Sequence, residues 1–188
     1  MGLRKWERME GSSLLVQKMT SKIINFIFFQ LVWFVCILGA AINQTHAAVA
    51  ASLIVILFHL YLTKDKKTEL KIILIASIIG FLFDGFLLKN EMVLYANHGW
   101  SYSITPLWII VLWMGFAITL NSSLSWLKKK IKLSALFGFI GGPLAYLAGE
   151  KLEAVTILSP NAIIVIAIGW AIITPLLIII TNKLPKND

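Results

Sequence analysis

The feature that most constrains this chain is a series of six long apolar runs separated by short polar segments. The runs cover residues 23–41, 47–62, 72–88, 106–124, 133–149 and 161–181. A helix of roughly 17 to 25 residues crosses a hydrocarbon core about 30 Å thick. The runs approach or reach that length, and they lack the alternation of apolar and polar residues that is typical of membrane β-barrels. We therefore predict an all-α, polytopic membrane protein with six transmembrane helices.

Composition excludes the main soluble classes. Of the 188 residues, 59% are hydrophobic and 14% are charged, whereas a soluble domain is nearer half apolar and a quarter charged. The net charge of +8 does not predict a nucleic-acid partner, because the positive residues lie between apolar runs and not on one soluble face. Cys36 is the single cysteine, and no Cys/His spacing typical of zinc is present. We expect no metal and no cofactor.

The positive charges predict the orientation. All but two of the 17 Lys and Arg residues lie before the first run or after the second, fourth or sixth. Such segments stay in the cytoplasm, so both chain ends are expected to be cytoplasmic, as an even number of spans also requires. The predicted parts are a cytoplasmic N-terminal extension (1–22), a six-helix transmembrane domain (23–181) and a cytoplasmic tail (182–188). Met19 offers a second possible start, which would place residues 1–18 upstream of the true one.

One carboxylate, Asp84, lies inside the third run, in "SIIGFLFDGFLL". Its position, four residues from the end of the run, is about 6 Å below the outer end of a helix. A carboxylate there needs a partner, water or a proton. In the fifth run Tyr146 and Glu150 follow one helical stripe at a spacing of four, and Glu150 reaches a level similar to that of Asp84. The predicted outer pocket comprises Asp84, Tyr146, Glu150, His98 and Trp100, with no catalytic residue assigned. An interhelical hydrogen bond accounts for Asp84 equally well.

Small residues predict close contacts between helices. Gly80 lies one turn before Asp84, and Gly138 with Gly142 forms a GxxxG pair. Pro143 removes a backbone donor and is expected to kink the fifth helix.

A second polar set approaches the cytoplasmic ends of the runs. Its members are Asn25, His59 and Asn121. Polar side chains at such positions form hydrogen bonds between helices. They would equally suit a polar cavity for a headgroup or a small solute, so both interpretations of this inner cluster stay open.

Four stretches carry a family resemblance. They are "FQLVWFVCILGA", "FLFDGFLL", "PLWIIVLWMGFAITLNSSLSWL" and "GFIGGPLAYLAGEKLEAV". From about residue 22 onward the chain resembles a bacterial inner-membrane family catalogued as domain of unknown function 2878. The resemblance implies a multi-pass protein of the bacterial inner (cytoplasmic) membrane. It also implies an association with cyclopropane-fatty-acid-synthase-like enzymes and flavin oxidoreductases, and hence with membrane-lipid modification or envelope stress.

Three functions remain under consideration from the sequence. The first is a non-enzymatic helper that binds a membrane lipid or a membrane-enzyme partner. The second is a small carrier or flippase for an amphiphilic solute, which would require a homodimer to form a path. The third is an intramembrane enzyme acting on acyl chains, with Asp84 or Glu150 as acid or base. No clear nucleophile–base pair is present, so the first function is favoured.

Overall fold

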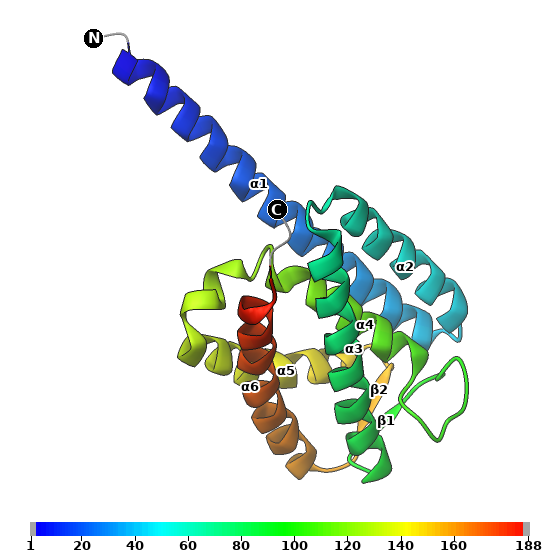
Figure 1. The fold of residues 1–188 in the computed structure, drawn as a ribbon. Coiled ribbons are helices and arrows are strands. Elements are labelled where there is room, and N and C mark those ends of the chain that lie inside the picture. The colour runs from blue at the N-terminus through cyan, green and yellow to red at the C-terminus, as the bar shows by residue number, and fades with distance from the viewer. Residues whose placement is uncertain (1–2, 186–188) are drawn as a thin grey trace.

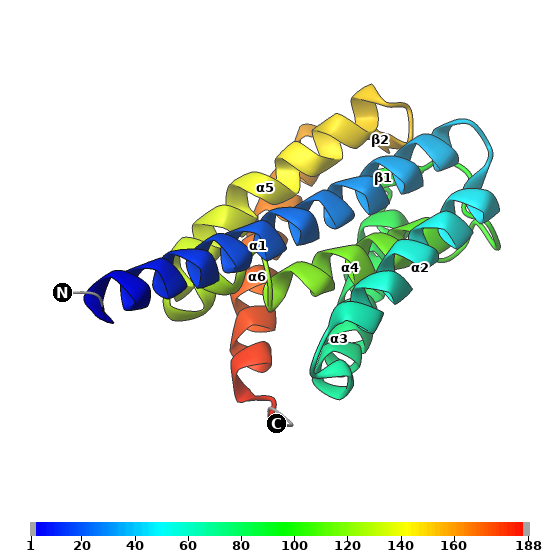
Figure 2. The same cartoon turned by 90° about the horizontal axis from the view of Figure 1, so that it is seen from above.

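The computed structural model describes residues 3–185 and the exposure of side chains from residue 19 onward. The helices are α1 (Leu3–Ala41), α2 (Thr45–Leu62), α3 (Lys66–Lys89), α4 (Leu107–Leu120), α5 (Ile131–Lys151) and α6 (Pro160–Lys183). A 3₁₀ turn, η1 (Ser125–Lys129), precedes α5. Two strands, β1 (Val93–Tyr95) and β2 (Val155–Ile157), complete the described elements. In both ribbon views the amino-terminal half of α1 extends beyond the other helices (Figures 1 and 2).

Five of the described helices are long and apolar enough to cross a membrane, and α4 is the exception. The fold is therefore that of a helical multi-pass membrane protein. The five long helices contain the predicted runs and extend beyond several of their ends. α1 continues without a break across residue 22, where the extension was predicted to end. Whether that extension is cytoplasmic stays a prediction.

The predicted helix over residues 106–124 is too long, because α4 ends at Leu120. The Leu124 amide donates back to the Thr119 carbonyl at 2.8 Å and closes a turn, so the helical ladder stops. α4 lies against α1, α2, α3 and α6, and Trp108, Ile118 and Leu120 are fully buried. A helix enclosed by protein does not have to match the thickness of the lipid core, which explains its 14 residues.

The prediction of an all-α chain missed a small antiparallel ribbon. Val93 pairs with Ile157 and Tyr95 with Val155, and the Leu158 amide donates to the Met92 carbonyl at 3.0 Å. These segments follow the carboxyl ends of α3 and α5, where the helical hydrogen bonds have ended. The backbone groups of the two strands therefore form hydrogen bonds with each other. We call this end of the molecule the ribbon end.

Hydrogen bonds between connections assign the other loops to the two ends. Asn97 donates its amide to Asn43 at 2.9 Å, which joins the α1–α2 turn to the ribbon end. At the opposite end, Thr68 donates to the Pro185 carbonyl at 2.8 Å, and Asn182 donates to the Lys128 carbonyl at 3.0 Å. We call this the lysine end. Successive helices therefore run between the two ends in alternate directions.

The helices form two packing groups. α1, α2, α3 and α4 pack with one another around α4, while α5 packs chiefly against α6. α3 and α4 also contact α6, and so connect the groups. Gly138 makes the close approach of α5 and α6 possible, because a Cβ at that position would lie 2.2 Å from the Trp170 carbonyl oxygen. A Cβ on Gly142 would meet the Trp170 ring at 2.4 Å.

Candidate functional site

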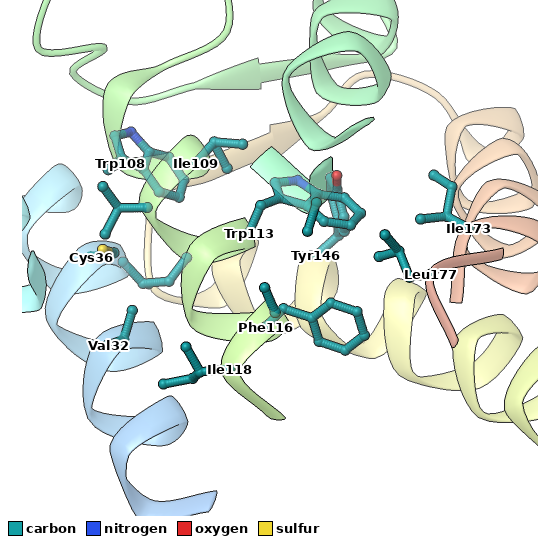
Figure 3. Close-up of a cluster of buried hydrophobic side chains, with 14 of the residues drawn as sticks. Val32, Cys36, Trp108, Ile109, Trp113, Phe116, Ile118, Tyr146, Ile173 and Leu177 are labelled. Atoms are coloured by element: carbon teal, nitrogen blue, oxygen red, sulfur yellow. The ribbon is translucent and has the colours of Figure 1, made fainter. Parts of the chain in front are cut away.

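Asp84 is the centre of a buried hydrogen-bond cluster near the ribbon end. Its Oδ1 accepts from the Tyr95 hydroxyl at 2.8 Å and from the Tyr146 hydroxyl at 2.5 Å. Its Oδ2 accepts from the Trp113 indole nitrogen at 2.7 Å. Asp84 is 1% exposed, and Figure 3 shows Trp113 of α4 next to Tyr146 of α5. The carboxylate therefore connects α3, β1, α4 and α5, and its main effect is to hold them together.

Gly80 explains how the Trp113 indole reaches the carboxylate. A Cβ on Gly80 would lie 2.0 Å from the Trp113 ring, so only glycine leaves space for the indole against α3. Asp84 is one turn further along the same face of α3. The same indole stacks on Trp170 of α6, with ring centroids 4.6 Å apart and planes at 14°. Sequence reasoning did not assign Trp113 to this cluster. The sequence feature that could have indicated a large side chain packed here is the one-turn spacing of Gly80 and Asp84.

The other residues predicted for the outer pocket do not bind Asp84 directly, although the His98 ring lies 6.3 Å from the Tyr95 ring between centroids. Glu150 accepts from the Ile157 backbone amide at 2.9 Å and so fixes the start of the connection to α6. His98 is buried, and its Nδ1 donates to the Ile104 carbonyl at 2.9 Å. Trp100 donates its indole N–H to the Thr105 carbonyl at 2.8 Å. These hydrogen bonds stabilise loops, and none of the three residues is hydrogen-bonded to Asp84.

Tyr95 gives the cluster a dependence on alkaline pH. Burial, and then the neighbouring Asp84 charge, raise the pKa of the Tyr95 phenol well above its usual value near 10. Its contribution to stability is therefore complete below pH 10 and is lost as pH rises above that. We expect the melting temperature of the wild type to fall more steeply between pH 9.5 and 11 than that of Tyr95→Phe. Parallel slopes in thermal melts of the two proteins in one detergent would contradict this.

The inner cluster predicted from the sequence is present as a connected network. Asn25 donates its amide N–H to the Ile118 carbonyl at 2.9 Å and lies 3.3 Å from His59 Nδ1. His59 Nε2 lies 3.0 Å from Glu69 Oε1. Asn121 donates to Glu69 Oε2 at 2.8 Å. His59 and Asn121 thus contact Glu69 directly, and Asn25 is linked to it through His59. Glu69 is a 3% exposed acid that was not predicted to belong to the cluster.

An open polar pocket of about 500 Å³ adjoins this network at the lysine end. Its polar wall comes from α1, α2, α3 and the segment after α4, and comprises Thr20, Ser21, Asn25, His59, Thr63, Glu69, Asn121 and Ser122. Its apolar wall comprises Ile24, Phe28 and Leu62. The pocket therefore presents one polar side and one apolar side. We call it the inner pocket.

A second cavity, of about 470 Å³, lies between the two packing groups. Its walls come from α1, α4, α5 and α6, and they include Trp33, Trp108, Trp113 and Trp170. The lining residues on α5 include five small ones, namely Gly138, Gly141, Gly142, Ala145 and Ala148, beside Phe137, Leu144 and Tyr146. We call this the apolar cavity. Asp84 lines neither of the two cavities.

Comparison with known proteins gives one match. A family model described as "Protein of unknown function (DUF2878)" matches residues 22–176. The chain belongs to this family. No curated protein and no solved structure matches it.

The DUF2878 region contains both clusters and all residues that line the apolar cavity. Of the inner pocket, only Thr20 and Ser21 precede it. The family assignment made from the sequence motifs is confirmed, whereas the bacterial inner membrane stays a prediction. Within residues 3–185, the DUF2878 chain has no group of three or more His, Cys, Asp or Glu side chains that could hold a metal ion.

Proposed function

We propose that this protein is a non-enzymatic lipid-binding helper whose apolar cavity holds an acyl chain of a membrane lipid. The observation that carries the proposal is the cavity of about 470 Å³ between α1, α4, α5 and α6. This volume is within the range of roughly 300–1,000 Å³ that is usual for small-molecule sites. Three of its four bounding helices, α1, α5 and α6, are long and apolar enough to cross a membrane, so the hydrocarbon of the bilayer is the available occupant.

The lining supports a hydrocarbon ligand over water. A buried water needs two to four polar partners, but most of the walls are aromatic rings, aliphatic side chains and glycines. Gly141 leaves space in particular, because a Cβ there would meet no atom within 4 Å. A lining of aromatic, aliphatic and small residues suits a flexible, narrow hydrocarbon chain.

The arrangement of Asp84 favours a helper over a carrier with an outer gate. A gate needs groups that exchange partners, but Asp84 accepts three hydrogen bonds and Glu150 is hydrogen-bonded to the backbone of Ile157. An enzyme acting on acyl chains would need Asp84 to line the cavity, and it does not. A membrane-enzyme partner, a homodimer and a link to lipid modification or envelope stress remain part of the proposal.

The proposed topology has six spans, with α4 crossing inside the shell of its neighbours. The lysine end faces the cytoplasm of a bacterial inner membrane, since the segments richest in Lys and Arg lie there. Both chain ends are then cytoplasmic. A reporter fused after residue 188 that is active only in the periplasm would contradict this orientation.

Filling the apolar cavity tests the proposed function. Gly141→Phe places a ring in open space, whereas Ile140→Phe changes a 51% exposed neighbour that does not line the cavity. We expect native mass spectrometry of gently purified protein to show bound lipid on the wild type and Ile140→Phe. Gly141→Phe should retain several-fold less bound lipid than either of these proteins. Equal lipid retention by all three folded proteins would refute the proposal.

A further inference from the structure

The orientation of the Asn25 amide determines the protonation state of His59. Amide orientations and histidine tautomers are assigned from the surrounding hydrogen bonds. Asn25 Oδ1 faces two donors, the Ser123 backbone amide at 3.1 Å and the Ser123 hydroxyl at 2.7 Å. Asn25 Nδ2 faces the Ile118 carbonyl, which only accepts. The amide N–H groups therefore point at Ile118 and at His59 Nδ1, and that ring nitrogen must be an acceptor.

The other ring nitrogen must carry the proton. His59 Nε2 lies 3.0 Å from Glu69 Oε1 and 3.2 Å from the Thr63 hydroxyl oxygen. The Thr63 hydroxyl donates to the His59 carbonyl at 2.9 Å, so its oxygen is free to accept from the ring. His59 is therefore a neutral imidazole that donates from Nε2, and the pair of His59 and Glu69 carries one net negative charge.

The groups that donate to the Glu69 carboxylate carry no positive charge. Both of its oxygens accept from uncharged groups, the His59 imidazole and the Asn121 amide. Glu69 also lies in the first turn of α3, where the helix macrodipole stabilises a negative charge. Lys128 contacts the oxygen of the Asn121 side chain, and so acts on Glu69 through an intervening amide. The charge of Glu69 thus acts on the inner pocket, of which Glu69 is a lining residue.

We infer that the inner pocket binds the ethanolamine phosphate headgroup of a lipid, with its primary ammonium directed at Glu69. A buried carboxylate in an open pocket favours a cation, and the hydroxyl groups of Thr63 and Ser122 supply further acceptors. The apolar wall of Ile24, Phe28 and Leu62 suits the start of an acyl chain.

Two lysines come directly after lining residues of the pocket in the sequence. Lys22 follows the lining residue Ser21, and Lys64 follows the lining residue Thr63. As part of this proposal, the lipid phosphate lies on the side of these lysines, and the ammonium lies deeper in the pocket. An anionic headgroup without an ammonium would bring its own charge to Glu69 and is disfavoured. This site is separate from the apolar cavity and does not depend on the function proposed for it.

Lipid selectivity tests the inference. Delipidated full-length protein is titrated in detergent with phosphatidylethanolamine, phosphatidylcholine or phosphatidylglycerol of identical acyl chains, and bound lipid is counted by native mass spectrometry. Choline cannot donate hydrogen bonds, so we expect the ethanolamine lipid to bind about tenfold more tightly than the choline lipid. Glu69→Gln should remove this preference. Glu91→Gln, which changes an exposed acid near the ribbon end, should retain it.

A second variant protects the test against misfolding of Glu69→Gln. Ser122→Phe narrows the pocket without changing a residue whose side chain contacts Glu69, and it should also reduce the preference. Gly141→Phe should keep the preference, because it alters the apolar cavity alone. Equal binding of the ethanolamine and choline lipids by the wild type would overturn the inference. So would tighter binding of phosphatidylglycerol, or a preference that survives both pocket variants.

Discussion

Asp84→Ala is expected to lower the free energy of unfolding by about 3 kcal/mol or more, because it leaves three buried donors without an acceptor. These donors are the hydroxyl groups of Tyr95 and Tyr146 and the indole N–H of Trp113. For a chain of this length, that loss corresponds to a decrease in melting temperature of roughly 6 to 12 °C. Thermal unfolding in detergent, followed by size-exclusion chromatography, would measure it.

Two further variants make the Asp84 result specific. Asp84→Asn keeps one oxygen for the tyrosines and loses the acceptor for Trp113, so its melting temperature should lie between those of the wild type and Asp84→Ala. Glu91→Ala removes an exposed acid from the turn after α3 and should change the melting temperature little. If Asp84→Ala melted within 2 °C of the wild type, or of Glu91→Ala, the carboxylate would not hold the four elements together.

Gly138→Ala should destabilise the α5–α6 pair by about 1–3 kcal/mol, as overpacking does elsewhere. Its new Cβ would lie 2.2 Å from the Trp170 carbonyl oxygen and 2.5 Å from the Thr174 hydroxyl oxygen. The first of these atoms belongs to the backbone, so the two helices must separate to relieve the contact. Separation would also disturb the stacking of Trp170 on Trp113, and the near-ultraviolet circular dichroism should weaken.

Gly141 provides a control on the same helix. A Cβ there would meet nothing within 4 Å, so Gly141→Ala gains helix propensity without a clash. We expect its stability to equal that of the wild type or to exceed it by roughly 0.5–1 kcal/mol. Both substitutions make the same chemical change, three residues apart on one helix. The difference between their free energies of unfolding therefore measures the effect of packing against Trp170. A stable Gly138→Ala protein would show that α5 and α6 are not in close contact there.

The sequence predicted the long helices well because continuous apolar runs leave few other structures for a membrane chain. Helical spacing placed Tyr146 in the same predicted pocket as Asp84, but it was Glu150 that the pattern put at the level of Asp84. α4 was predicted too long because the predicted run included the polar residues 121–123 and ended at Leu124, while the helix ends at a turn closed at Thr119. Hydropathy does not report such a hydrogen bond.

The parts that were missed depend on contacts between distant segments. Glu69 stood in a polar segment with Lys64 and Lys66, which indicated only a cytoplasmic loop. The Asp65 cap, which accepts from the Thr68 amide at 3.2 Å, starts α3 well before the apolar run and brings Glu69 into the protein. The ribbon was missed because its strands, three residues each, are too short for a pattern.

The enclosed position of α4 has a consequence for how the chain is assembled during synthesis. A helix of 14 residues is about 21 Å long, which is less than the hydrocarbon thickness it would have to cross alone. Its main neighbours, α1, α2 and α3, all leave the ribosome before it. The first three helices can thus be in the bilayer before α4 is made. The short fourth helix then packs against protein that is already present.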